Sequence, residues 1–256
     1  MTPDDPQAVF LCTNDDGIHA PGLALLVEAA RAHGAVQVVA PDRQQSASSH
    51  SLTLHRPLRL TPVDKDRHTV DGTPTDCVLV AIRDVLASPP RFVLSGINHG
   101  PNMGEDVLYS GTVAAAMEAT ILGVPAIAFS YTGYESTHLD SYRGLVENLI
   151  GELLRRPGFP RETFLNVNLP DIPAGDVRGI EITALGRRIY HDSLSRRTDP
   201  RGREYLWIGG GTSDWSGRDD SDFRAVRAGY VSVTPMHLDL TNFRLLEEVK
   251  SWKLSP

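Results

Sequence analysis

Apolar residues along the first half of the chain fall into blocks whose lengths suit strands and helices in turn. Residues 8–13 and 36–40 are short, continuous apolar runs, which is typical of strands buried on both faces. Between them, Pro21 precedes a segment with the apolar spacing of an amphipathic helix, carried by Leu23, Leu26, Val27 and Ala30. The pattern therefore predicts a strand, a helix and a second strand.

The same alternation resumes beyond a serine-rich segment. Residues 72–87 are predicted as a helix, because Thr73 suits the N-cap position and a proline follows it. Strands are expected at 91–96 and 125–130, with an alanine-rich helix at 110–123 between them. Alternation of this kind predicts an α/β fold, in which helices cover both faces of an open, mostly parallel sheet.

The second half of the chain has a different pattern. An amphipathic helix is expected at 140–156, and shorter strand-like runs follow it. Six arginines lie between residues 187 and 203, in a segment that is too polar to be core. We expect this segment, at about residues 185–210, to form a hairpin arm that protrudes from a β-rich C-terminal extension.

Composition narrows the class of protein. The 256 residues are 41% hydrophobic and 22% charged, as in ordinary soluble globular proteins. A net charge of −7 argues against stable binding of nucleic acid, which requires a basic surface. No uncharged apolar run approaches the ~18 residues of a membrane span, and Cys12 and Cys77 are expected to be reduced core thiols. These features predict a soluble, cytoplasmic protein without a membrane partner.

Polar residues gather directly after three of the predicted strands. Residues 14–17 (Asn-Asp-Asp-Gly) follow the first strand, 41–51 follow the second and 95–112 include the end of the third. The carboxyl ends of parallel strands form one edge of a sheet, and open α/β sheets bind their ligands there. We therefore expect the three stretches to converge on one ligand site.

The residue types in these stretches suit a hard cation beside a phosphate. Asp15 and Asp16 supply negative charge, and the serines and asparagines of the other two stretches supply neutral oxygen ligands. Such a donor set favours Mg²⁺ or Mn²⁺, which would also offset the repulsion between adjacent carboxylates. Ser110, Gly111 and Thr112 place backbone N–H groups and hydroxyls at a predicted helix N-terminus, where phosphate binds readily.

Each feature also has a plain structural alternative. Asp15 or Asp16 could cap the following helix, and Ser46 could be a solvated loop serine. Asparagines beside glycines are common in turns, and residues 110–112 could be a simple N-cap. The expected convergence of all three stretches favours a ligand site over these separate alternatives.

Ordered segments across most of the chain resemble the SurE family, the stationary-phase survival proteins that act as nucleoside monophosphate phosphatases. These segments read TNDDGIHAPGL, VVAPDRQQSASSHSLTL, GTPTDCV, SGINHGPNMGEDVLYSGTVAAAMEA, DPRGREYLWIGG and GYVSVTPMHLDLT. One departure is visible, because Gln45 stands where many relatives have a basic residue. The departure leaves open one phosphate contact and hence the substrate preference.

The resemblance implies a Rossmann-like core and a specific set of ligands. One divalent ion per subunit would be bound by Asp15, Asp16, Ser46 and Asn98. The phosphate-binding residues it implies are Asn102, Ser110, Gly111 and Thr112. We expect residues 1–135 to form the core that binds metal and phosphate, and residues 136–256 to complete it. The resemblance further implies a homodimer or homotetramer built through the C-terminal arm.

The expected activity is metal-assisted hydrolysis of nucleoside monophosphates by a 5′-nucleotidase, with 3′-monophosphates as a further candidate substrate. Asp15 and Asp16 are the candidate catalytic residues, since they would anchor the ion and one of them would orient or deprotonate the attacking water. Alternatives are a broader phosphomonoesterase, an exopolyphosphatase, a non-catalytic nucleotide-binding module and a structural assembly protein. A covalent aspartyl-phosphate route is disfavoured, because adjacent residues point to different sides of an extended chain.

Overall fold

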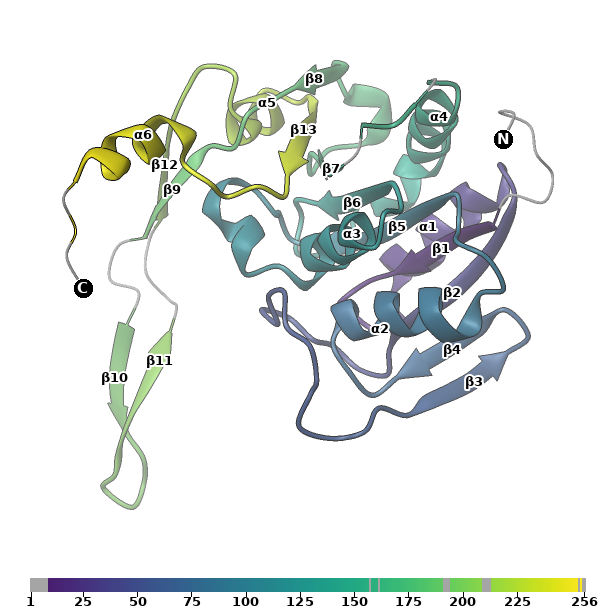
Figure 1. The fold of residues 1–256 in the computed structure, drawn as a ribbon, viewed down its shortest axis with the longest axis horizontal. Helices are drawn as coiled ribbons and strands as arrows, with labels where there is room; N and C mark the ends of the chain where they lie inside the picture. Colours follow the sequence, from purple (N-terminus) through teal and green to yellow (C-terminus); the bar gives the residue numbers. More distant parts are fainter. Residues whose placement is uncertain are drawn as a thin grey trace.

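The centre of the molecule is a nine-stranded sheet (Figure 1). The computed structural model describes residues 9–156, 158–160, 162–190, 194–208, 213–252 and 254. In spatial order the strands are β3 (Leu60–Asp64), β4 (Arg67–Val70), β2 (Ala35–Pro41), β1 (Val9–Thr13), β5 (Phe92–His99), β6 (Ala126–Tyr131), β7 (Thr163–Leu169), β13 (Val231–His237) and β8 (Ile180–Ile182). The strands from β4 to β7 are mutually parallel, whereas β3 and β13 run antiparallel to their inner neighbours.

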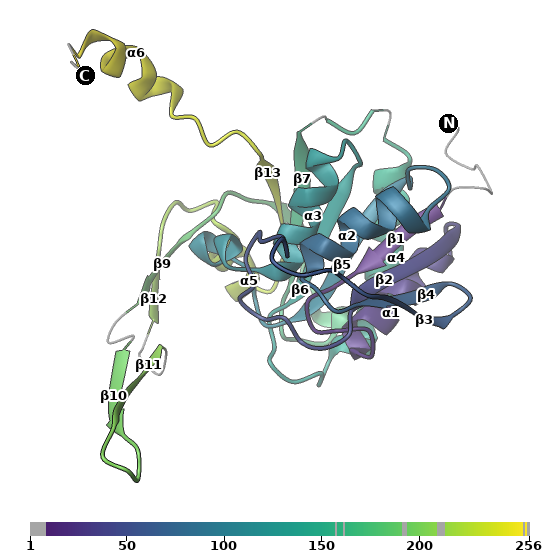
Figure 2. The same ribbon diagram turned by 60° about the horizontal axis from the view of Figure 1, so that its bottom comes forward.

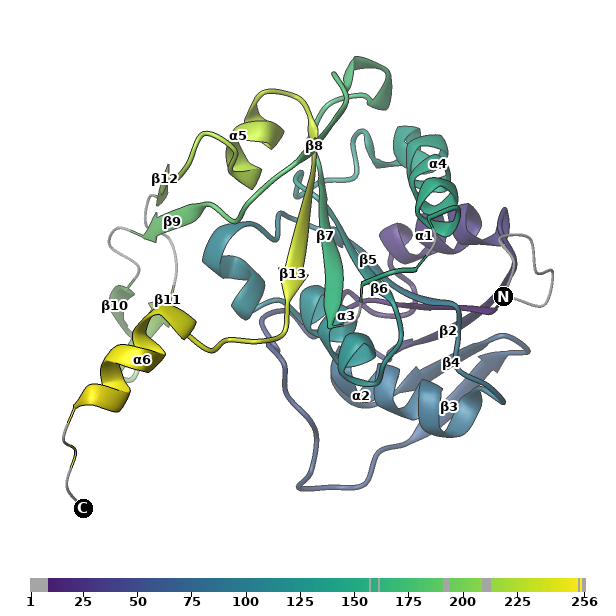
Figure 3. The ribbon, with the colours of Figure 1, turned by 45° about the horizontal axis from the view of Figure 1, so that its top comes forward.

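Helices cover both faces of this sheet, as Figures 1 and 3 show. On one face, α1 (Pro21–Arg31) and α4 (Arg143–Leu154) bury their apolar sides against one core cluster. On the other face, α2 (Pro74–Val80) and α3 (Gly111–Ile121) pack on a second cluster. The predicted α/β fold class is confirmed, and β1 lies in the interior of the sheet with a neighbour on each side.

Local sequence signals set several of these boundaries. At the start of α2 the Thr73 hydroxyl accepts a hydrogen bond from the Asp76 backbone N–H, and the Asp76 carboxylate accepts one from the Thr73 backbone. The helix predicted for residues 72–87 is shorter in α form, because it ends at Val80 and continues as a π-helical turn, Ala81–Val85. Short 3-10 turns occupy Gly104–Leu108, Leu139–Tyr142 and Ala174–Asp176.

The hairpin of β3 and β4 was not predicted from the sequence. Most of β3 is exposed, and residues 64–69 are all polar, so residues 60–70 carry little of the apolar signal that marks an inner strand. The hairpin nevertheless extends the sheet, because β4 pairs in parallel with β2 and places Arg67 beside Val38.

The C-terminal half adds an arm and an outlying helix (Figures 1 and 2). The arm consists of two antiparallel pairs, β9 (Arg187–Tyr190) with β12 (Ser213–Ser216) and β10 (Leu194–Thr198) with β11 (Glu204–Ile208). Of the predicted arm at about 185–210, positions 191–193 and 209–210 lie outside the described residues. Helix α5 (Asp222–Arg227) lies near the root of the arm, whereas α6 (Phe243–Ser251) stands off the body and buries none of its residues.

The helices of the structure were compared with the requirements of a membrane span. In the part of the chain that the structure describes, no helix combines the length and the apolar character that crossing a bilayer requires.

Candidate metal and phosphate site

Asp15 and Asp16 lie just beyond the end of β1 and face different partners. The Asp15 side chain is buried, and its Oδ1 accepts a hydrogen bond from the Thr112 hydroxyl. Asp16 is nearer the surface, and its Oδ2 lies 3.2 Å from the His99 backbone nitrogen and 3.5 Å from His99 Nδ1. The two adjacent carboxylates therefore connect β1 to two other segments, the start of α3 and the end of β5.

The loop after β2 reaches the same place through its backbone. The Gln45 N–H donates to the Asp15 carbonyl at 2.7 Å, and the Ser49 hydroxyl donates to the Leu108 carbonyl at 2.7 Å. Ser46 itself is exposed, and its Oγ accepts from Gln44 Nε2 at 2.9 Å. Among the described residues, no hydrogen bond joins Ser46 Oγ to either aspartate. The loop is thus in place, and the role of Ser46 as a ligand stays a prediction.

Asn98 lies near the end of β5, next to the histidine that contacts Asp16. Its Nδ2 donates to the Gly100 carbonyl at 2.9 Å, an arrangement that fixes the side-chain amide. Because the amide nitrogen is engaged in this way, Oδ1 is the atom that remains available as an oxygen ligand. This orientation is compatible with the predicted role of Asn98 at a metal ion.

The N-terminus of α3 packs directly against Asp15. Ser110 is its N-cap, with Oγ accepting from the Val113 N–H at 3.1 Å, and its contact with phosphate stays a prediction. Gly111 is required by close packing: a Cβ there would lie 2.7 Å from Ser48 Oγ and 2.8 Å from Asp15 Cβ. The helix N-terminus, with its positive end of the dipole, therefore lies beside a buried carboxylate.

Asn102 is held by strands of the sheet. Its Nδ2 donates to Ser130 Oγ at 2.8 Å, and its backbone N–H donates to Asn168 Oδ1 at 2.9 Å. Its carbonyl accepts from Asn166 Nδ2 at 2.8 Å and from Asn168 Nδ2 at 3.0 Å. These bonds fix the course of the loop between β5 and α3, and contact of Asn102 with phosphate stays a prediction.

Comparison with known proteins identifies the family. The family model described as Survival protein SurE matches residues 10–192. A curated protein of Gemmatimonas aurantiaca, named 5′-nucleotidase SurE, is 57% identical over 250 residues, which is 96% of this chain and 99% of its own. A second, of the same name from Geobacter sulfurreducens, is 51% identical over 249 residues, or 96% of this chain and 94% of its own. The chain belongs to the SurE family.

Structural comparison gives the same result. The crystal structure of a SurE protein from Aquifex aeolicus has a TM-score of 0.84 to this chain at 43% identity, over 94% of this chain and 98% of that one. The SurE resemblance of the sequence segments is therefore confirmed over nearly the whole chain.

The buried aspartate of this SurE protein is electrostatically unfavourable without a cation. Burial raises the pKa of Asp15 from 3.8 to about 6, the Thr112 hydrogen bond lowers it, and the adjacent Asp16 raises it further. A divalent ion would supply the opposite charge. Among the described residues, no group of three or more histidine, cysteine, aspartate or glutamate side chains could hold a metal. An ion at Asp15 and Asp16 would therefore be completed by neutral oxygens, as Mg²⁺ and Mn²⁺ accept.

Two buried oxygens support this fit. Within the part of the chain that the structure describes, Asn14 Oδ1 and Ser48 Oγ are buried without a hydrogen-bond partner. Buried polar atoms are nearly always satisfied in folded proteins. Asn14 precedes Asp15 in the chain, and Ser48 Oγ borders Gly111 as Asp15 does, so the two atoms are consistent with a site that water or a ligand completes.

Sequence reasoning gave no role to several residues that the structure places at the site. His99 joins Asp16 to Ser136, whose Oγ lies 2.8 Å from His99 Nε2. Asn166 and Asn168 hold Asn102 from β7 and are fully buried. The available signal was the polar alternation in TFLNVNLP, where two asparagines interrupt an otherwise apolar strand.

Proposed function

We propose that this protein is a divalent-metal-dependent 5′-nucleotidase, which hydrolyses nucleoside monophosphates to nucleoside and phosphate. The observation that carries the proposal is the contact of Asp15 with Thr112, which places a candidate metal ligand at the N-terminus of α3. Two curated relatives that are 57% and 51% identical bear the name 5′-nucleotidase. We include 3′-monophosphates as a second candidate substrate.

The candidate residues form two groups, one for the metal ion and one for the phosphate. Asp15, Asp16, Ser46 and Asn98 would hold one Mg²⁺ or Mn²⁺ ion, which when bound supplies charge to the phosphoryl oxygens and activates water at neutral pH. The backbone N–H groups of Gly111 and Thr112 would bind the phosphate oxygens at the positive end of α3. Asn102 is our further candidate for a phosphate contact.

Two carboxylates with neutral partners suit a dianionic substrate. A site with four carboxylates would have a net negative charge and would repel a phosphate monoester. Asp15 and Asp16 together only balance the charge of one divalent ion, so the site would not repel the substrate. Asp16, which is the more exposed of the two, would orient or deprotonate the attacking water. The His99 backbone N–H donates a 3.2 Å hydrogen bond to Asp16 Oδ2, which holds the Asp16 carboxylate in place.

Phosphate release from a panel of 5′- and 3′-nucleoside monophosphates tests the proposal. The protein would be assayed with EDTA, and again after Mg²⁺ or Mn²⁺ is restored, beside Asp16→Asn. We expect release to disappear with the chelator, to return with the metal and to be lost in the variant. Release that persists in EDTA would contradict the metal dependence. Equal rates on glycerol phosphate or polyphosphate would favour the broader phosphomonoesterase or the exopolyphosphatase.

We also propose that the protein assembles as a homodimer or homotetramer through its C-terminal extension. Large apolar side chains are exposed on the arm, with Trp207 at 64% and Ile208 at 86%, and around α6, with Phe243 at 63% and Leu254 at 75%. Exposed apolar surface of this kind marks protein contacts. Light scattering on the full chain and on a chain truncated before α6 would test this, since truncation should lower the assembly number.

A further inference from the structure

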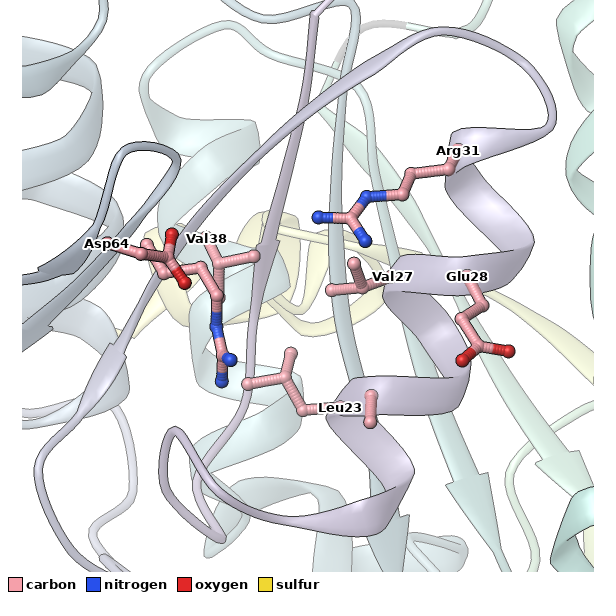
Figure 4. Close-up of a pocket in the computed structure, with 8 residues that line it drawn as sticks. Leu23, Val27, Glu28, Arg31, Val38 and Asp64 are labelled. Carbon is pink, nitrogen blue, oxygen red and sulfur yellow. The ribbon is translucent and has the colours of Figure 1, made fainter.

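A second pocket lies between α1 and the strands β2 to β4 (Figure 4). Its volume is about 260 Å³, and the eight residues that line it include none of the candidate metal or phosphate ligands. The floor is apolar, with Val27 of α1 facing Val38 of β2, and Arg67 lies beside Val38 on the neighbouring strand. Two arginines and two carboxylates complete the lining.

The two carboxylates of this pocket each contact a group other than its arginines. Glu28 Oε2 lies 3.3 Å from Arg143 Nη1, and Figure 4 shows the Glu28 carboxylate turned away from β2. Asp64 Oδ1 accepts a hydrogen bond from the Asp66 backbone at 3.1 Å. Asp64 lies opposite Arg67 in the β3–β4 pair, but among the described residues no salt bridge joins either acid to Arg31 or Arg67.

The two arginines retain most of their hydrogen-bonding capacity. Arg31, whose guanidinium is turned toward β2 in Figure 4, forms no hydrogen bond or ion pair with any described residue. Arg67 donates one bond, from Nη2 to the Ile18 carbonyl at 2.7 Å. A guanidinium carries five N–H donors in a planar fork that matches the oxygens of phosphate. The donors that remain are therefore suited to an oxyanion.

We propose that this pocket is a second anion site, in which Arg31 and Arg67 bind the phosphoryl group of inorganic phosphate or of a small phosphate ester. The volume is below the ~300–1,000 Å³ of sites for drug-sized ligands, which suits a compact anion. Val27 and Val38 provide an apolar wall for the carbon atoms of an ester.

The same arginine connects the pocket to the metal-site loop. Ile18, whose carbonyl accepts from Arg67, lies two residues after Asp16 and is buried. An anion that engages the remaining N–H groups of Arg67 acts on a side chain that already holds this loop. Binding of an anion in the pocket is therefore expected to change the environment of the Ile18 backbone.

Binding can be measured without metal or turnover, which separates this proposal from the proposed nucleotidase activity. The full chain, treated with EDTA, would be titrated with sodium phosphate and with glycerol phosphate at constant ionic strength, and backbone amide NMR signals followed. We expect saturable shifts at Val27, Arg31 and Val38, accompanied by a shift at Ile18. Tighter binding of glycerol phosphate would identify an ester as the occupant, and tighter binding of phosphate would identify the free ion.

Substitutions of the two arginines test whether the anion binds in this pocket. Arg31→Gln should weaken this binding at least tenfold and leave the fold intact, since Arg31 is exposed at the end of α1. Arg67→Gln should weaken it similarly. Arg83→Gln, an exposed arginine outside the pocket lining, serves as the matched control and should not change it. Shifts confined to residues 110–112, or an equal effect of Arg31→Gln and Arg83→Gln, would overturn the proposal.

Discussion

The Thr112 hydroxyl donates a hydrogen bond to Asp15 Oδ1, across 97 positions of sequence. This one bond fixes the N-terminus of α3 beside the carboxyl end of β1. It also determines which oxygen of Asp15 is already engaged and which is available to a cation.

Removing this hydroxyl should impair the site and preserve the fold. Thr112→Val keeps the side-chain shape and removes the donor, so a bond to a charged group worth about 1.5–3 kcal/mol is lost. We expect kcat/KM for a nucleoside monophosphate to fall by about 10- to 100-fold. Thr112→Ser, which keeps the hydroxyl, is the control. Equal losses in both variants would show that packing, not the hydrogen bond, is responsible.

The buried charge of Asp15 should destabilise the protein when metal is removed. Its folded pKa of about 6 exceeds the ordinary value of 3.8, so the folded state holds the proton more tightly and stability decreases as the pH rises through this window. The difference amounts to about 3 kcal/mol at neutral pH. In EDTA, Asp15→Asn should therefore be more stable than the wild type at pH 7, and the advantage should vanish near pH 4.

Urea denaturation of both proteins across this pH range measures the effect. Restoring Mn²⁺ should stabilise the wild type much more than Asp15→Asn, because only the wild type keeps both carboxylates. An advantage of the variant that does not depend on pH would contradict the assignment to Asp15.

Close packing at Gly111 should make this position intolerant of a side chain. Gly111→Ala places a Cβ 2.7 Å from Ser48 Oγ and 2.8 Å from Asp15 Cβ, so the loop after β2 or the aspartate must move. We expect a loss of about 1–3 kcal/mol in unfolding free energy together with reduced activity. The control is Gly144→Ala on α4, where nothing lies within 4 Å and alanine should stabilise the helix by up to about 1 kcal/mol.

Asp222 should be essential to the root of the arm. Its carboxylate accepts hydrogen bonds from the backbone N–H groups of Gly104, Gly186 and Phe223, each at 2.8 Å. Asp222→Ala leaves these buried donors unsatisfied, at about 1–3 kcal/mol each, so thermal unfolding should shift down by several degrees. Asp219→Ala, whose side chain is 98% exposed, should leave the unfolding temperature unchanged.

The cysteines should be inert in the native protein. Cys12 and Cys77 are fully buried free thiols, and burial raises the pKa of Cys12 to about 12 and that of Cys77 well above its usual value. Alkylation by iodoacetamide at pH 8 should therefore require unfolding. Rapid modification of either thiol under conditions that preserve activity would contradict the packing described here.

Much of the fold could be predicted because its signals are local. The buried strands β1 and β5 are continuous apolar runs, and the start of α2 has its capping residues in adjacent positions. The β3–β4 hairpin escaped prediction because β3 is mostly exposed and residues 64–69 are all polar, so the hairpin has little hydrophobic pattern. Helix α6 was missed although Phe243, Leu246 and Val249 have helical spacing. The place of the hairpin is set by the pairing of β4 with β2, which is a long-range contact.

The candidate site, like the fold, could be predicted in part from the sequence. Parallel topology alone brings the ends of β1, β2 and β5 to one edge, so the convergence of Asp15, the Ser46 loop and Ser110 follows from the sequence. The contacts of His99 with Asp16 and of Asn102 with Asn168 depend on strand register across the sheet. Strand register could not be predicted from the single sequence, because it depends on pairing between strands that are far apart in the chain.

The asparagines of β7 have a consequence for biosynthesis. The loop that carries Asn98, Asn102 and Ser110 is fixed in part by Asn166 and Asn168, which are synthesised more than fifty residues later. A nascent chain that has reached only residue 135 contains every predicted metal ligand but lacks the strand that fixes this loop. We therefore expect the ribosome-bound chain to complete its site only when β7 has emerged and paired with β6.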